Sequence, residues 1–203
     1  MSKYRPLETL LGFYAFGNEY TVFAGKPGVH AHYTAVHEST HAILGCATSF
    51  GIFQKFIAYL SNAGPPAISA VAGEMLSISI DQVRSVHEAT ATFAEFMAAH
   101  TANYSGLPDM ERGLPLEYRE WRAIYDDVFQ PSIPHRARWY LADHLSRSAL
   151  DTAILSDYAD LSDEKIGAFS AYLGEPENSP EIRLSAILDH VKRADQEIGR
   201  AHV

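Results

Sequence analysis

The residues with the clearest capacity for chemistry lie in segment 36–44, which reads Val-His-Glu-Ser-Thr-His-Ala-Ile-Leu. Within it, His37, Glu38 and His41 form an H-E-x-x-H pattern. Residues four apart on an α-helix lie on one face, about a turn apart, so both imidazoles can bind one metal ion. Glu38 stands beside them, where its carboxylate can take a proton from a zinc-bound water. The pattern therefore predicts the zinc site of a hydrolase, with Glu38 as its catalytic residue.

These ligands converge only if the segment is helical, and the apolar residues around it indicate a helix. From about His30 they recur at three- and four-residue spacing, at Tyr33, Val36, Thr40, Ile43, Leu44 and Ala47. This spacing makes one apolar stripe on a helix, and the two histidines lie at its edge. Ligands at the edge of such a stripe can face inward and still reach solvent.

A catalytic zinc usually has three protein ligands, so the site needs one from another element. The three-histidine extension of the motif fails, because Leu44 holds the required glycine position and Ala47 the required histidine position. A second long helical pattern runs from Ala67 to about Ala102, with a break conceivable near residues 77–81. Its segment 85–95, Ser-Val-His-Glu-Ala-Thr-Ala-Thr-Phe-Ala-Glu, is the best source of the third ligand.

This segment and the motif at 36–44 together resemble the gluzincin branch of zinc metallopeptidases, the thermolysin-like group. In that group a downstream helix supplies a glutamate, often followed by small residues and a second acidic residue. The resemblance covers these two short motifs. It implies that Zn²⁺ is bound by His37, His41 and Glu88, with Glu38 as general base.

The chain departs from that group in three respects. The separation of 47 residues between His41 and Glu88 is longer than in the compact thermolysin-like arrangement. Ala91 stands where a second acidic residue is often found, three positions after the third ligand. No signal for a multi-stranded sheet precedes the motif helix. We therefore expect a zincin-like protein outside any named family.

Glu95 has a role that follows from helix geometry, since it lies seven residues, about two turns, beyond Glu88 on the same face. A metal-bound histidine normally donates its other N–H to a carboxylate or carbonyl, so Glu95 is a candidate second-shell partner. It is also the alternative third ligand. Glu88 has a competing structural role, because Ser85-Val-His-Glu88 matches a capping box at a helix start. His87 is about 100° away from Glu88 around a helix, which favours a surface or core position.

A peptidase also needs a group that stabilises the developing oxyanion. The candidates are Tyr104, Tyr118, Tyr125, His135, Tyr140 and His144. We slightly favour the helix from residue 135, because Arg136, Tyr140 and His144 share one face at four-residue spacing.

The rest of the chain predicts a mainly α protein with a small N-terminal β-hairpin or sheet, an α+β fold class. Aromatic and β-branched runs between Leu10 and Ala24 flank a two-residue turn signal at Gly17-Asn18, which favours a hairpin. Further helices are expected over residues 50–60, 115–129, 135–155, 162–173 and 179–198. We find no clear linker, so residues 1–203 are expected to form a single zincin-like domain, its motif helix packed against the second long helix.

Composition narrows the classes of partner. A net charge of −9 and the lack of a Lys/Arg cluster argue against nucleic acid, and the single cysteine, Cys46, excludes a Cys-rich zinc site. No apolar run is long enough to span a membrane, so a cytoplasmic protein without a membrane partner is expected. The oligomeric state is not predicted.

The leading hypothesis is a zinc metallopeptidase that cleaves a peptide or protein substrate. One alternative is a catalytically degenerate helical module that binds or inhibits a partner. Another is a di-metal carboxylate bundle, since Glu38-Ser-Thr-His41 is also an E-x-x-H motif. Such bundles need this motif twice, and the chain contains no second copy.

Overall fold

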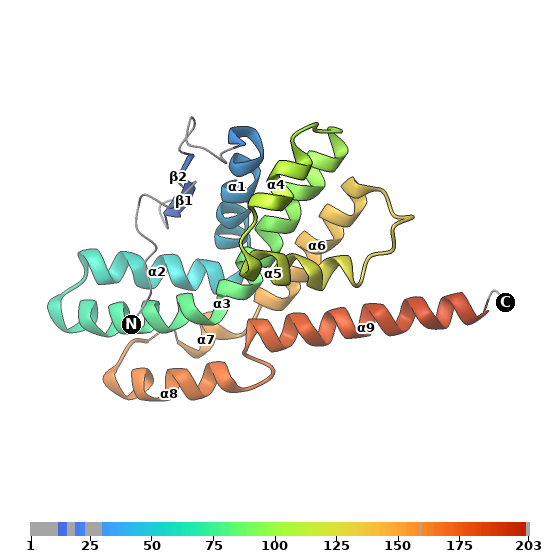
Figure 1. Ribbon diagram of the computed structural model, residues 1–203. Helices are drawn as coiled ribbons and strands as arrows, with labels where there is room; N and C mark the ends of the chain where they lie inside the picture. The colour runs from blue at the N-terminus through green and yellow to red at the C-terminus, as the bar shows by residue number, and fades with distance from the viewer. Residues whose placement is uncertain (1–11, 16–18, 23–29, 159, 202–203) are drawn as a thin grey trace.

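The computed structural model describes residues 12–15, 19–22, 30–158 and 160–201 (Figure 1). In these residues the chain forms nine helices and two short strands. The strands are β1 (Gly12–Ala15) and β2 (Glu19–Val22). The helices are α1 (Ala31–Ala47), α2 (Ser49–Ala63), α3 (Pro66–Thr101), α4 (Leu107–Gly113), α5 (Leu116–Asp126), α6 (His135–Leu150), α7 (Ile154–Asp157), α8 (Asp163–Gly174) and α9 (Pro180–Ala201).

The expected α+β fold class is wrong, because the described chain is mainly α-helical. The extended structure within it is limited to β1 and β2, which pair antiparallel over four residues each. The turn expected at Gly17-Asn18 lies outside the described residues. A pair of such short strands buries too little apolar surface to form a layer of its own. The core of the described part is built from helices and loops between residues 33 and 188.

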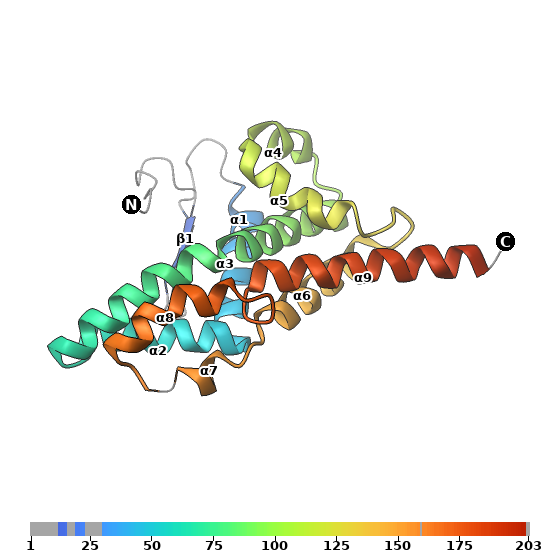
Figure 2. The same ribbon diagram turned by 90° about the horizontal axis from the view of Figure 1, so that it is seen from below.

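The long helix α3 organises the fold, since it contacts α1, α2, α4, α5, α6, α8 and α9. Figures 1 and 2 show α3 running through the body, with α9 extending beyond the helices that it contacts. Its 36 residues continue through 77–81, where a break was conceivable. The polar residue there is accommodated, because the buried Ser79 hydroxyl donates to the Leu76 carbonyl at 2.9 Å and accepts from Gln54 Nε2 at 3.3 Å.

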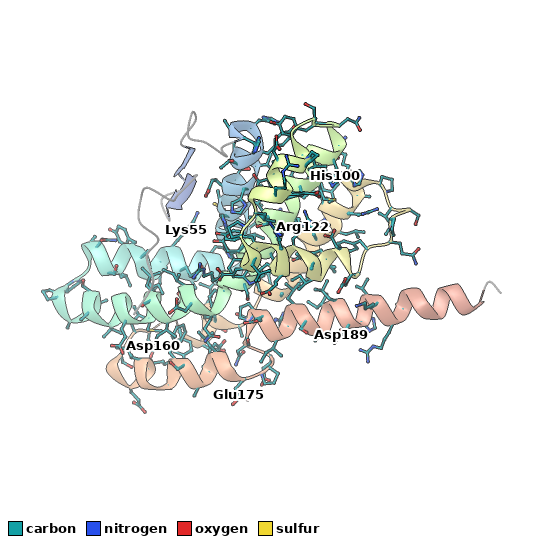
Figure 3. The ribbon with its side chains drawn as sticks, viewed as in Figure 1. Lys55, His100, Arg122, Asp160, Glu175 and Asp189 are labelled. Atoms are coloured by element: carbon teal, nitrogen blue, oxygen red, sulfur yellow. The ribbon has the colours of Figure 1, made fainter. Side chains whose placement is uncertain are left out.

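The C-terminal third of α3 is buried between other helices and carries small side chains. Ala89, Ala91, Thr92 and Ala94 have no exposed surface. Small side chains let helix axes approach closely, so ligands on two helices can reach a common point. The far end of α3 meets α4, α5 and α6 near His100 and Arg122, both labelled in Figure 3.

Helices α1 and α2 meet at an angle of 89°. At the corner, the Thr48 side chain accepts a hydrogen bond from the Gly51 amide at 3.1 Å and so caps α2. A Cβ on Gly51 would lie 2.5 Å from Gly45 Cα and 2.6 Å from the Leu44 carbonyl oxygen, so the close approach requires glycine. No single described helix is long and apolar enough to cross a membrane; only the bent α1–α2 pair meets the length and composition requirements.

Two short helices, α4 and α7, were not expected from the sequence. The helix predicted over 135–155 instead ends at Leu150, and the chain turns back toward the start of α2. There the Ser49 amide donates to the Asp151 carboxylate at 2.9 Å, and its hydroxyl donates to the Thr152 carbonyl at 2.8 Å. These contacts with a distant residue compete with continuation of the helix, and local periodicity contains no sign of them.

Candidate metal centre

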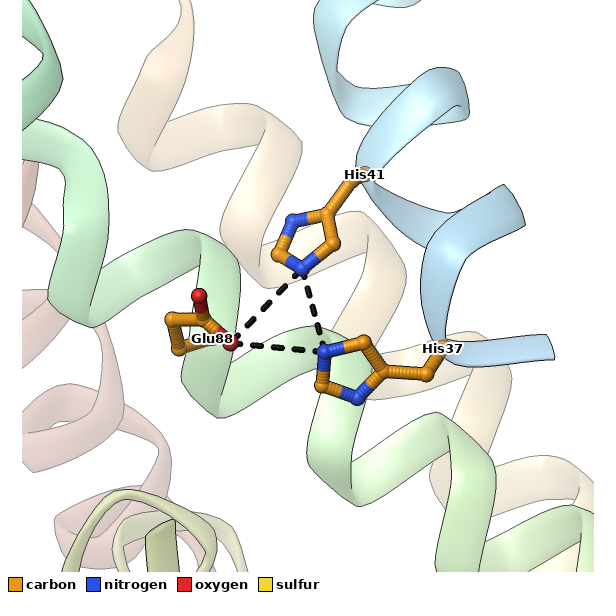
Figure 4. A group of neighbouring side chains, drawn as sticks. All are labelled: His37, His41 and Glu88. Carbon is orange, nitrogen blue, oxygen red and sulfur yellow. Dashed lines mark hydrogen bonds and ion pairs between the residues drawn. The ribbon is translucent and has the colours of Figure 1, made fainter. Parts of the chain in front are cut away.

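Helices α1 and α3 bring His37, His41 and Glu88 to one point (Figure 4). The two Nε2 atoms of the histidines lie 3.2 Å apart. Glu88 Oε2 lies 3.3 Å from His37 Nε2 and 3.7 Å from His41 Nε2. The three residues form the one group of three or more His, Cys, Asp or Glu side chains that could hold a metal ion in the part of the chain described.

The triangle formed by these three atoms fits a tetrahedral zinc ion. Bonds of 2.0–2.2 Å at the tetrahedral angle separate ligand atoms by about 3.3–3.5 Å. The sides of 3.2, 3.3 and 3.7 Å scatter around this value. A point about 2.1 Å from all three atoms, above the plane that they define, therefore exists, and this distance is within the range of zinc–imidazole bonds. Two imidazoles and a carboxylate are also a common donor set of catalytic zinc.

The polar groups at this point are incompletely satisfied by protein. Glu88 Oε2 is buried and makes no hydrogen bond of good geometry to any described residue. It has ionic contacts only, with the two histidines. Buried polar atoms are almost always hydrogen-bonded, so this oxygen has an unused capacity to bind a cation. The side chains of His37 and Glu88 as a whole remain 11 % and 19 % exposed.

Glu95 occupies the position expected of a residue that orients a ligand. Its Oε2 lies 3.4 Å from His37 Nδ1, on the side of the ring opposite the Nε2 atom that faces Glu88. The contact is an ion pair. His37 Nδ1 has no hydrogen-bond partner of good geometry among the described residues. Glu88 therefore lies beside the Nε2 atoms of both histidines, and Glu95 lies on the Nδ1 side of His37. Because α3 passes unbroken through Ser85, the capping role considered for Glu88 is wrong.

The two carboxylates set the charge of His37. Burial by itself lowers the pKa of this imidazole, but Glu88 and Glu95 outweigh it and raise the pKa to about 10. Burial likewise raises the pKa of the Glu88 carboxyl, and the two histidines more than reverse this, leaving it well below its ordinary value. Without a metal ion, His37 and Glu88 therefore form an imidazolium–carboxylate pair.

Glu38 is buried beside the two histidines, with 6 % of its surface exposed. Burial raises the pKa of its carboxyl, opposed by the charges of His37 and His41. A carboxylate with a raised pKa is a stronger base than one in water, so the environment suits proton abstraction.

His87 is a neighbour of the site that the sequence did not reveal. Its ring stacks on that of His41, with centroids 5.7 Å apart and an interplanar angle of 17°. Burial, together with the charge of His41, lowers the pKa of His87 to about 3 against the opposing effect of Glu88. The ring is thus neutral at pH 7 and packs on a proposed ligand instead of lying on the surface. In the sequence, the one sign of this contact was that His87 adjoins the proposed ligand Glu88.

Among the expected oxyanion-stabilising residues, Tyr118 of α5 is the one whose ring neighbours the site, with its centroid 6.3 Å from that of His37. The others have different surroundings. Tyr104 forms a hydrogen bond with His30, and the buried Tyr125 hydroxyl contacts the hydroxyls of Thr90 and Ser146. The His135 ring stacks on that of His100. On the favoured face of α6, the exposed Tyr140 interacts with Arg136 at 3.3 Å.

Comparison with known proteins gives no relative: no family model, curated protein or solved structure matches the chain.

Proposed function

We propose that the chain is a zinc-dependent metallopeptidase. The observation that carries this proposal is the triangle of His37 Nε2, His41 Nε2 and Glu88 Oε2, whose sides match those of a tetrahedral zinc site. A zinc ion there would supply Lewis acidity, polarising the scissile carbonyl and making a bound water more acidic.

The chain's own residues supply proton transfer and orientation. Glu38 takes the proton of the attacking water and then delivers it to the leaving amine. Glu95 holds the His37 ring by its Nδ1 side, so that Nε2 stays directed at Glu88. His87 covers the His41 ring by stacking. All these groups project from two helices, a rigid support for a constellation of ligands.

Substitution of Glu38 by glutamine tests the assignment, because it removes the base and keeps the size of the side chain. We expect the variant to bind one zinc per chain and to lose about 10²–10⁴-fold in the rate of peptide hydrolysis. Zinc is measured by elemental analysis and hydrolysis with a fluorescently labelled unfolded protein. Glu74→Gln, the same change at an exposed position of helix α3, is the matched control and should keep full activity. Full activity in Glu38→Gln would refute the mechanism.

The same elemental analysis separates the alternatives. A di-metal carboxylate protein would hold two iron or manganese ions, and a degenerate binding module would hold no stoichiometric metal. The geometry favours a single ion, since the three ligand atoms lie within 4.8 Å of one another and no second such group occurs among the described residues.

A further inference from the structure

Helices α1 and α3, which carry the proposed zinc ligands, contain a single lysine or arginine between them, Arg84. It stands four residues before Glu88, which is about one helical turn away on the same face. The charged residues closest to the site are otherwise acidic: Glu38, Glu88 and Glu95 all act on the charge of its groups. Its ion pair with Glu117 is long, at 3.9 Å, so this cation one turn from a ligand of an acidic site calls for an explanation beyond helix stability.

Aromatic side chains of α5 connect Arg84 to the metal site. The Tyr118 ring neighbours that of His37, and it packs edge-on against Trp121 at 5.0 Å between centroids. The guanidinium carbon of Arg84 lies 5.7 Å from the Trp121 ring centroid, within the range of a cation–π contact. The series His37, Tyr118, Trp121, Arg84 thus forms a continuous wall from the zinc ligands to the cation.

The guanidinium of Arg84 is available to a ligand. Its side chain is 41 % exposed, and its contact with Glu117 Oε1 is 3.9 Å long. An ion pair this long between exposed side chains contributes little to stability. An arginine stacked on an aromatic ring keeps its edge N–H groups free, and these match a carboxylate with two parallel hydrogen bonds.

We propose that Arg84, supported by Trp121, binds a carboxylate of the substrate. This inference rests on the proposed peptidase function and extends it to a substrate class. The carboxylate lies on the Arg84 side of the site, beyond the Tyr118 and Trp121 rings. Its two possible sources are the peptide's C-terminus and an aspartate or glutamate side chain.

The first test measures binding, so that it does not depend on turnover. Hippurate, an N-acyl amino acid with a free carboxylate, and its neutral amide are titrated by calorimetry into zinc-loaded Glu38→Gln protein. We expect hippurate to bind more tightly than the amide. Arg84→Met should weaken hippurate binding about tenfold or more, as for loss of a charged hydrogen bond, and Arg84→Lys should weaken it less.

Arg136→Met is the matched control, since Arg136 also stacks on an aromatic ring, that of Tyr140 at 5.6 Å, on helix α6. It should leave hippurate binding unchanged. A circular dichroism spectrum identical to that of the parent protein establishes that each variant is folded. Equal affinity for hippurate and its amide, or equal affinity of the Arg84 and Arg136 variants, overturns the inference.

The second test identifies the source of the carboxylate by hydrolysis. Matched peptides carry a free or amidated C-terminus, and glutamate or glutamine beside the scissile bond. Arg84→Met should raise KM for one carboxylate-bearing set and leave kcat/KM for the neutral peptides unchanged. Peptide cleavage that does not depend on Arg84 overturns this inference and leaves the peptidase intact. Arg84-dependent binding of hippurate without any cleavage contradicts the peptidase and keeps the carboxylate site.

Discussion

Zinc binding should release a proton from His37, and this makes the affinity for zinc depend steeply on pH. The pKa of His37 is about 10 without metal, since Glu88 and Glu95 favour the imidazolium over the opposing effect of burial. Zinc binds only the neutral imidazole, so the ion has to displace that proton. Glu88 is already ionised because the pKa of its carboxyl lies well below the ordinary value, and it releases none.

The size of the effect follows from the distance between the working pH and that pKa. Removing a proton at pH 7 from a group of pKa about 10 costs about 4 kcal/mol, a thousandfold in the dissociation constant. The penalty falls by 1.4 kcal/mol for each pH unit gained. The dissociation constant of zinc should therefore drop about tenfold per unit between pH 7 and pH 9 and level off near pH 10.

Calorimetry at pH 7 in buffers of different ionisation enthalpy counts the protons released, and competition with a chelator gives the dissociation constant at each pH. We expect about one proton from His37. In Glu95→Gln one of the two carboxylates is lost, so the pKa of His37 falls and the affinity for zinc levels off at lower pH. A dissociation constant that stays constant from pH 7 to pH 9 would show that His37 is neutral in the metal-free protein, contrary to the charges assigned here.

Three further predictions concern the ligands and the scaffold. Glu88→Ala should lose stoichiometric zinc by elemental analysis, and Glu95→Ala should keep it, with a dissociation constant raised about 10- to 100-fold at pH 10, where proton release from His37 no longer opposes binding; loss in both or in neither contradicts the assignment. Tyr125→Phe removes a hydroxyl that contacts Thr90 and Ser146, so urea denaturation should show a loss of about 1–2 kcal/mol with zinc content unchanged. Gly51→Ala should lower stability by at least about 1–3 kcal/mol, because its Cβ would meet the α1 backbone. In contrast, Gly167→Ala, at an exposed position of α8 with no atom near the new Cβ, should stabilise by about 0.5–1 kcal/mol; a similar response of both glycines would contradict the packing at the corner.

Residue spacing was sufficient to predict which site groups share a helix face. His37 and His41 are four apart and do point their Nε2 atoms at one place. Glu88 and Glu95 are seven apart and do contact the same histidine on its two nitrogens. Both relations are local, since they depend on 3.6 residues per turn and on no other part of the fold. The apolar stripe that directs one face of a helix toward the core is also a local feature of the sequence.

Which side chains of other helices lie beside these site residues depends on how the helices pack. Residue spacing contains no information on helix packing. His87 was expected to point away from the site because it is 100° from Glu88. The α1 helix nevertheless lies so that His41 stacks on it. Tyr118 comes from α5, which packs against α3 and brings this ring beside His37. The short helices α4 and α7 span seven and four residues, too few for a periodic pattern to stand out.

The mainly helical fold bears on what the proposed zinc site requires. Its inner ligands come from positions on two helices that pack closely, and the fully buried Ala89, Ala91 and Ala94 on α3 permit such packing. Nothing in the coordination itself requires a strand. What a sheet commonly adds is an edge on which a peptide can be held by its main chain. In the described part of this chain, β1 and β2 pack against α1, and the wall of Tyr118, Trp121 and Arg84 lies beside the proposed metal site. The proposed binding of a substrate carboxylate by Arg84, one turn from Glu88, would add recognition by charge.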